Sequence, residues 1–130
     1  MLTHTIRLAG PWELTVDGRD DPVCVRLPFA LPDDTRTAQL TRRFHRPAGL
    51  TVQTVVRIEI GLNDRLRQLD VNGTQIPVIQ PDIRESATGW ISAFDLTTAL
   101  LPFNVLQIEL AADTGRPSEI QSAVLVIVEP

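Results

Sequence analysis

Apolar and polar residues alternate along several short segments of this chain. The clearest case is 52–60, where Val52, Thr54, Val56, Ile58 and Ile60 share one phase and mostly polar residues fill the other. Successive side chains of a strand point to opposite faces, so a period of two predicts a strand with one face in a core. The same alternation, or a strand-sized apolar run, occurs at 12–16, 23–27, 69–71, 106–110 and 123–128. The chain is therefore predicted to be all-β.

Clusters of Gly, Pro, Asn and Asp separate these segments and predict turns. They lie at 17–22, 32–34, 47–49, 63–64, 72–73 and 113–117. No run between them has room for a crossover helix, which favours a two-sheet antiparallel β-sandwich over strand–helix alternation. Asn72-Gly73 predicts a hairpin between two paired strands, because a type I′ turn needs positive φ at both central positions. One short helical turn is expected at 96–101, with Asp95 as its cap and Pro102 as its stop.

Length and composition indicate one globular domain, residues 1–130. The chain is 43% hydrophobic and 22% charged, close to the average for globular proteins, which argues against disorder. The longest apolar run, 123–128, is far too short to cross a bilayer, so no membrane span is expected. The first residues lack a basic region followed by an apolar run, so no secretory signal is expected and a cytoplasmic location is predicted.

The charge pattern argues against nucleic acid as a partner. The net charge is −4, and all twelve basic residues are arginines. Their densest cluster, Arg42, Arg43 and Arg46, is outweighed by acids elsewhere in the chain. Binding to phosphate backbones requires a clustered basic face, which this sequence lacks.

Neither a metal nor a cofactor is predicted. Cys24 is the single cysteine, and its place between two valines predicts a half-buried, unreactive thiol. His4 and His45 are far apart with no third ligand in register, and the aspartates at 17, 20 and 21 match no calcium loop.

A series of short motifs, taken in order, resembles the N-terminal sugar-binding domain of family-2 glycoside hydrolases, the β-galactosidase and β-glucuronidase group. That domain opens with a Gly-x-Trp strand and a Leu-Pro phrase, and it continues with an aromatic-x-Arg-x-Phe-x-x-Pro strand, a Val-x-x-Asn-Gly-like hairpin, a Phe-x-Asp-[Ile/Leu]-Thr corner and an Asn-x-Leu-x-[Ile/Val] strand. The similar segments here are 10–12, 26–28, 40–47, 70–73, 89–97 and 104–108, with Leu40 in place of the aromatic residue.

The resemblance implies a galactose-binding-like jelly roll, made of two antiparallel sheets packed face to face. It also implies that catalytic carboxylates lie on a separate barrel domain of about 250 residues, which this chain has no room for. We therefore expect a non-catalytic module and no enzyme activity from this chain alone.

Trp90 and its polar neighbours are the predicted ligand-binding residues. Sugar sites combine an aromatic face with fixed polar groups, and Trp90 follows a polar segment expected to be a loop. Asp82, Arg84 and Glu85 in that segment can contact hydroxyl groups, although a charged loop is most often simply solvated. For Trp90 the alternative is core packing at the strand start, which is favoured because large aromatic residues are usually mostly buried. Arg42 shares the inward phase of its strand with Leu40 and Phe44, which predicts a structural ion pair or a place in a cleft.

Other conspicuous residues are given structural roles. Trp12 is expected in the core, Asn72 in a turn, Asp95 at a cap, and Asn104 bonded to backbone at a strand start.

Two functions stay open. The first is a carbohydrate-binding module with a pocket at a loop end, and the second is a protein-interaction or self-association domain that uses free sheet edges.

Overall fold

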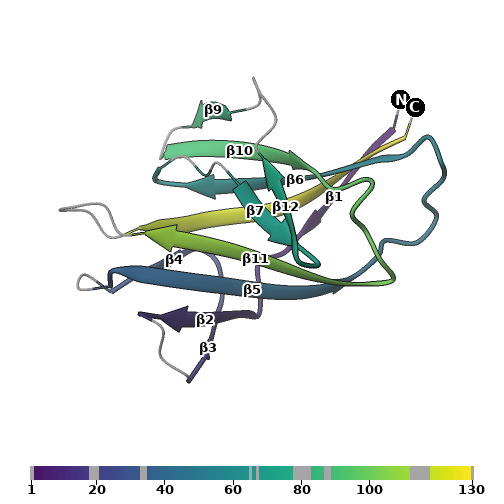
Figure 1. The fold of residues 1–130 in the computed structure, drawn as a ribbon. Coiled ribbons are helices and arrows are strands. Elements are labelled where there is room, and N and C mark those ends of the chain that lie inside the picture. Colours follow the sequence, from purple (N-terminus) through teal and green to yellow (C-terminus); the bar gives the residue numbers. More distant parts are fainter. Residues whose placement is uncertain are drawn as a thin grey trace.

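The computed structural model describes residues 2–17, 21–32, 35–64, 66, 68–77, 83–86, 89–111 and 118–129. Strands and turns make up this described part, and all paired strands run antiparallel (Figure 1). The predicted all-β sandwich is confirmed. No helix among the described residues is long and apolar enough to span a membrane.

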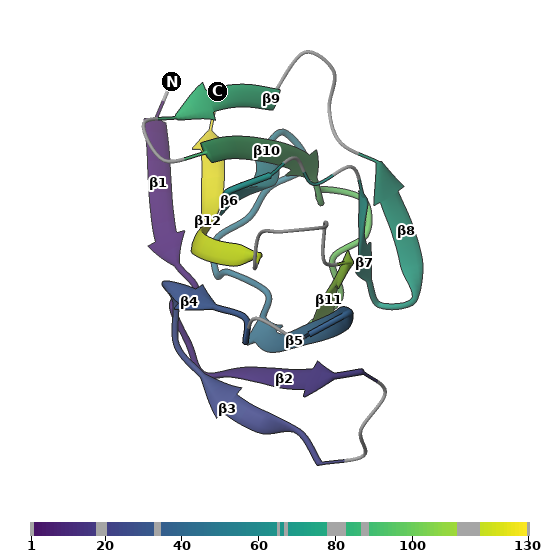
Figure 2. The same ribbon diagram turned by 90° about the vertical axis from the view of Figure 1, so that its left-hand side faces the viewer.

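Two sheets form the sandwich. The first sheet has the order β1 (Leu2–Arg7), β12 (Glu119–Glu129), β6 (Val55–Leu62), β10 (Gly89–Asp95) and β9 (Ile83–Ser86), with β4 (Phe29–Ala30) also paired to β12. The second sheet has the order β3 (Val23–Val25), β2 (Trp12–Val16), β5 (Thr37–His45), β11 (Phe103–Ala111), β7 (Gln68–Val71) and β8 (Thr74–Pro77). Figure 2 shows the two layers with the β7–β8 hairpin at the opposite end of the second sheet from β2 and β3.

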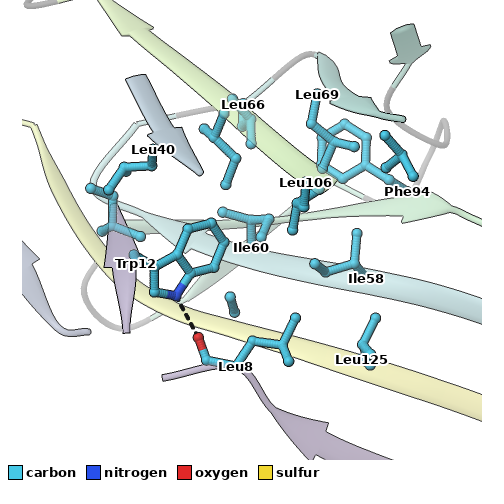
Figure 3. Close-up of a cluster of buried hydrophobic side chains, with 14 of the residues drawn as sticks. Leu8, Trp12, Leu40, Ile58, Ile60, Leu66, Leu69, Phe94, Leu106 and Leu125 are labelled. Atoms are coloured by element: carbon cyan, nitrogen blue, oxygen red, sulfur yellow. Dashed lines mark hydrogen bonds between the residues drawn. The ribbon is translucent and has the colours of Figure 1, made fainter. Parts of the chain in front are cut away.

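The core lies between the sheets and consists of the inward phase of each alternating segment. In β6 the buried positions include Val56, Ile58 and Ile60, and in β11 they include Leu106 and Ile108. The aliphatic side chains of the two layers lie side by side in Figure 3. Since antiparallel sheets can bury one face and expose the other, the opposite phase of each strand faces outward.

The Asn72-Gly73 hairpin is confirmed. Asn72 and Gly73 have φ values of 53° and 83°, the positive values that a type I′ turn requires. The flanking strands pair with Leu69 opposite Ile76 and Val71 opposite Thr74.

The segment 96–101 forms a turn but no helix. The amide of Ala99 donates to the carbonyl of Leu96 at 3.0 Å, and Asp95 Oδ1 accepts from the amide of Thr97 at 2.9 Å. Thr97 Oγ1 also accepts from the amide of Val56 at 3.0 Å, which ties the turn to the start of β6. The capping role of Asp95 is confirmed. The segment is too short for a helix to propagate, because Thr97 is bonded to Val56 and strand β11 begins at Phe103.

Two local predictions were wrong. Strand β6 begins at Val55, because the preceding residues form a turn in which the amide of Thr54 donates to the carbonyl of Thr51 at 3.2 Å, and Val52 is fully exposed. Cys24 is exposed, not half-buried, because β3 is a three-residue strand at the edge of the second sheet.

Candidate functional site

Trp90 lies at the start of β10, half-buried, where it pairs with Leu62 of β6 on one side and with Glu85 of β9 on the other. The residue before it, Gly89, has to be a glycine, because a β-carbon at this position would collide with the carbonyl oxygen of Leu62. Trp90 also has an interaction with a neighbouring group, and its part in ligand binding stays a prediction.

The polar segment before Trp90 differs from the predicted loop. Asp82 lies outside the described residues, whereas Arg84 and Glu85 belong to strand β9. Glu85 is opposite Trp90 in the pairing, and Arg84 is opposite Ile91. This polar segment therefore forms a strand through its pairing with β10, although its sequence lacks the apolar alternation of the other strands.

Arg42 lies on the second sheet, in the middle of β5 opposite Leu106. Its Nη1 donates to the carbonyl of Arg43 at 2.9 Å, and its buried Nε has no hydrogen-bond partner. Among the described residues Arg42 has no carboxylate within ion-pair distance, so the predicted structural ion pair is absent. Arg42 and Trp90 lie on different sheets, so they belong to no common row of paired strands.

A different cluster of polar side chains lies on the outer face of the second sheet. Gln107 of β11 is opposite Asp70 of β7, and Asp70 is in turn opposite Gln75 of β8. On its other side Gln107 is opposite Thr41 of β5. Directly opposite residues on one face have β-carbons about 4.5–5.5 Å apart, so the register places these four side chains in one row across four strands.

This row borders a hollow of about 200 Å³, which we call the polar hollow. Its lining residues come from β5, β7, β8 and β11: Thr37, Leu69, Asp70, Gln75, Gln107, Glu109, Leu110 and Ala111. Within the described part of the chain, the side chains of Asp70, Gln75, Gln107 and Glu109 have no hydrogen-bond or ion-pair partner. Two carboxylates and two amides therefore remain available to a ligand.

The lining gives the polar hollow a defined chemistry. Carboxylates only accept hydrogen bonds, whereas each glutamine amide both donates and accepts. None of the described lining residues is basic. The hollow thus suits a ligand that donates several hydrogen bonds and carries no negative charge.

An exposed aromatic pair lies on the same outer face. Phe103 and His45 are opposite each other in the β11–β5 pairing, and their rings meet edge to face with centroids 4.9 Å apart. We call this pair the aromatic pair. Sequence reasoning missed it, although Phe103 shares the outward phase of Gln107 and Glu109.

A second, larger hollow of about 350 Å³ lies at the corner between β1, β12 and the segment before β4. It is lined by Arg7, Ala9, Leu27, Pro28, Gln121, Ser122, Ala123 and Val124. The pairing of β12 with β6 shifts register between Ile120 and Ser122, next to the part of β12 that lines this hollow. Its walls are mainly aliphatic, and they offer fewer groups for hydroxyl recognition than the polar hollow does.

Metal chemistry has no evident place in the described residues. No group of three or more His, Cys, Asp or Glu side chains there is arranged to hold a metal ion.

Comparisons with known proteins identify the fold. No family model matches the sequence, and no curated protein matches it. Among solved structures, the chain is similar to an FMN-binding β-glucuronidase from Faecalibacterium prausnitzii L2-6, with a TM-score of 0.73 and 19% identity over 97% of this chain and 22% of that one. For a β-glucuronidase from Bacteroides uniformis the TM-score is 0.71 with 14% identity, over 98% of this chain and 18% of that one. For a β-glucuronidase from Ruminococcus gnavus the TM-score is 0.68 with 15% identity, over 98% of this chain and 28% of that one.

The chain therefore spans less than a third of the length of these β-glucuronidases. It shares the β-sandwich fold of the part that it matches, and at the level of the fold this confirms the resemblance to family-2 glycoside hydrolases.

Proposed function

We propose that this chain is a non-catalytic carbohydrate-binding module that holds uncharged sugars in the polar hollow. The observation that carries the proposal is the set of four side chains, Asp70, Gln75, Gln107 and Glu109, that line one hollow and have no hydrogen-bond or ion-pair partner among the residues that the structure describes. The fold likeness to parts of β-glucuronidases, enzymes named for a sugar acid, supports a role in sugar recognition. The match to less than a third of each enzyme supports a role apart from catalysis.

The chemistry of the hollow suits a sugar ring. Sugar hydroxyls donate to carboxylates and both donate to and accept from amides, and fixed polar groups of this kind set the orientation of a bound ligand. The groups stand on paired strands, which hold a constellation more firmly than loops do. The volume is below the roughly 300 Å³ of pockets that enclose drug-sized ligands, so part of a glycan enters while the rest lies on the sheet.

Charge selects among sugars. Asp70 and Glu109 are diagonal neighbours across β7 and β11, and such neighbours are about 7–8 Å apart in a sheet, with their β-carbons somewhat closer. With no basic residue among the described lining residues, they repel a carboxylate. The module should therefore bind neutral sugars and reject uronic acids.

Titration of the full chain with D-glucose, D-galactose, D-mannose and D-glucuronate tests the proposal by calorimetry. At least one neutral sugar should bind at millimolar concentration, and D-glucuronate should not. Asp70→Asn should weaken that binding roughly tenfold or more, because a hydrogen bond to a charged acceptor is stronger than one to a neutral acceptor. Glu13→Gln is the matched control, since Glu13 lies on the same face outside the hollow and is paired with Arg43 at 2.7 Å. Failure of every neutral sugar to bind would refute the proposal.

A second candidate function is self-association through free sheet edges. It is favoured by the exposure of Leu2 and Ile6 on edge strand β1 and of Val23 on edge strand β3. An edge strand offers unpaired backbone groups to another chain, and a stable contact buries about 1,000 Å² or more. Light scattering that shows a dimer, abolished by Ile6→Lys, would support this function. A monomer at all concentrations would exclude it.

A further inference from the structure

We propose that the ligand is an extended oligosaccharide, and that Phe103 supports a second sugar ring along β11 from the polar hollow. This inference rests on the proposed function and adds the ligand's length and a second contact point. The aromatic pair and the polar hollow lie on the same outer face, joined by one continuous strand.

The exposure of Phe103 is the first observation. Its side chain is 72% exposed, although a phenylalanine gains stability when it is covered. His45 holds the ring from the neighbouring strand in an edge-to-face contact, with an interplanar angle of 63°. An aromatic ring fixed in this way and open to solvent is the surface on which the apolar face of a sugar ring stacks.

The spacing along β11 is the second observation. Phe103, Val105, Gln107 and Glu109 follow the outward phase of the strand. Gln107 follows Phe103 by four residue steps of antiparallel strand, a distance of about 14 Å at 3.4 Å per residue. A ring held in the polar hollow cannot also touch Phe103, so one sugar cannot use both places, but a linear chain can.

The surface between the two places is compatible with such a chain. Val105 lies there, half-buried, opposite Arg43 of β5. Arg43 is held by Glu13 in an ion pair at 2.7 Å, so its charge is balanced within the sheet face. Thr41, opposite Gln107, adds a small hydroxyl side chain at the edge of the track.

The role assigned to the histidine is positioning. His45 contacts the ring of Phe103 edge to face and holds it from the neighbouring strand. His45→Ala should therefore weaken binding of long ligands less than Phe103→Ala does, while binding of single sugars stays unchanged.

The test compares single sugars with their linear tetramers. D-glucose, D-galactose and D-mannose are titrated beside cellotetraose, galactotetraose and mannotetraose into the wild type, Phe103→Ala, Phe103→Trp and the control Val52→Ala. For the sugar that binds, the wild type should hold the tetramer about tenfold or more tighter than the single ring. Phe103→Ala should remove this gain and leave the affinity for the single ring unchanged. Phe103→Trp and Val52→Ala should both keep the gain.

Each contrary outcome has its own meaning. Equal affinity of the wild type for a single sugar and its tetramer would overturn the inference while leaving the polar hollow as a monosaccharide site. An unchanged tetramer affinity in Phe103→Ala would overturn it as well. Absence of binding by every probe would overturn the proposed function and this inference with it.

Discussion

Replacement of Trp12 by alanine is expected to lower the free energy of unfolding by about 3–5 kcal/mol, the cost typical of removing a buried large aromatic side chain. The side chain is 1% exposed and packs among aliphatic residues of both sheets, including Leu40 and Ile60 (Figure 3). Its indole Nε1 donates to the carbonyl of Leu8 at 2.6 Å, which joins the segment before β2 to the core.

Denaturant unfolding followed by circular dichroism measures this effect. Trp12→Phe keeps most of the apolar ring but leaves the buried Leu8 carbonyl without its donor, so a smaller loss of about 1–3 kcal/mol is expected. The fully exposed Val52→Ala serves as the control and should change stability by less than about 0.5 kcal/mol. A loss below about 1 kcal/mol in Trp12→Ala would contradict the described packing.

Asn104→Ala is expected to cost about 3 kcal/mol or more, because the buried Asn104 side chain makes several hydrogen bonds to part-buried groups that would lose their partner together. Asn104 Oδ1 accepts from the amide of Leu101 at 2.8 Å, and Nδ2 donates to the carbonyl of Leu101 at 2.8 Å. Asn72 Nδ2 donates to the same Oδ1 at 2.9 Å, and Asn72 Oδ1 accepts from the amide of Val105 at 2.9 Å. The two asparagines thus join the β7–β8 hairpin to the start of β11.

This network also supports the proposed site, because it joins the β7–β8 hairpin, which contains Asp70 and Gln75, to strand β11, which contains Phe103 and Gln107. Thermal and denaturant unfolding of Asn104→Ala and Asn104→Asp test it. Asp should not rescue stability, because it retains an acceptor but cannot donate to the Leu101 carbonyl. Gln39→Ala, an exposed change on neighbouring β5, is the control. Stability of Asn104→Ala within about 0.5 kcal/mol of the wild type would show that the network contributes little.

Most of the fold could be predicted from local patterns. Alternation places one phase of β6 and of β11 in the core, and Asn72-Gly73 specifies its hairpin through backbone conformation alone. The predictions for Val52 and Cys24 were wrong because an alternating sequence does not show where a strand begins or whether another strand covers it. Val52 continues the alternation of β6 but lies in a turn, and Cys24 has apolar neighbours but sits on a sheet edge.

The candidate site was harder to predict, for a physical reason. Asp70, Gln107 and Gln75 are ordinary polar residues in their own strands, and only the pairing of β7 with β11 places them in one row. That pairing joins segments far apart in the sequence, and nothing local specifies its register. From the sequence alone Trp90, the conspicuous aromatic residue, was therefore selected as a ligand-binding candidate. Phe103, which shares the outward-facing phase of β11 with polar residues, was not selected.

Nitrogen-15 NMR titration of the full chain with the three neutral sugars and their linear tetramers tests most directly whether the outer face of the second sheet binds carbohydrate. The side-chain amide signals of Gln75 and Gln107 should shift in a saturable way, together with backbone signals of β7 and β11, while the indole signal of Trp12 stays in place. Shifts confined to the Trp90 indole and its neighbours, or no shifts with any sugar, would contradict the proposed site.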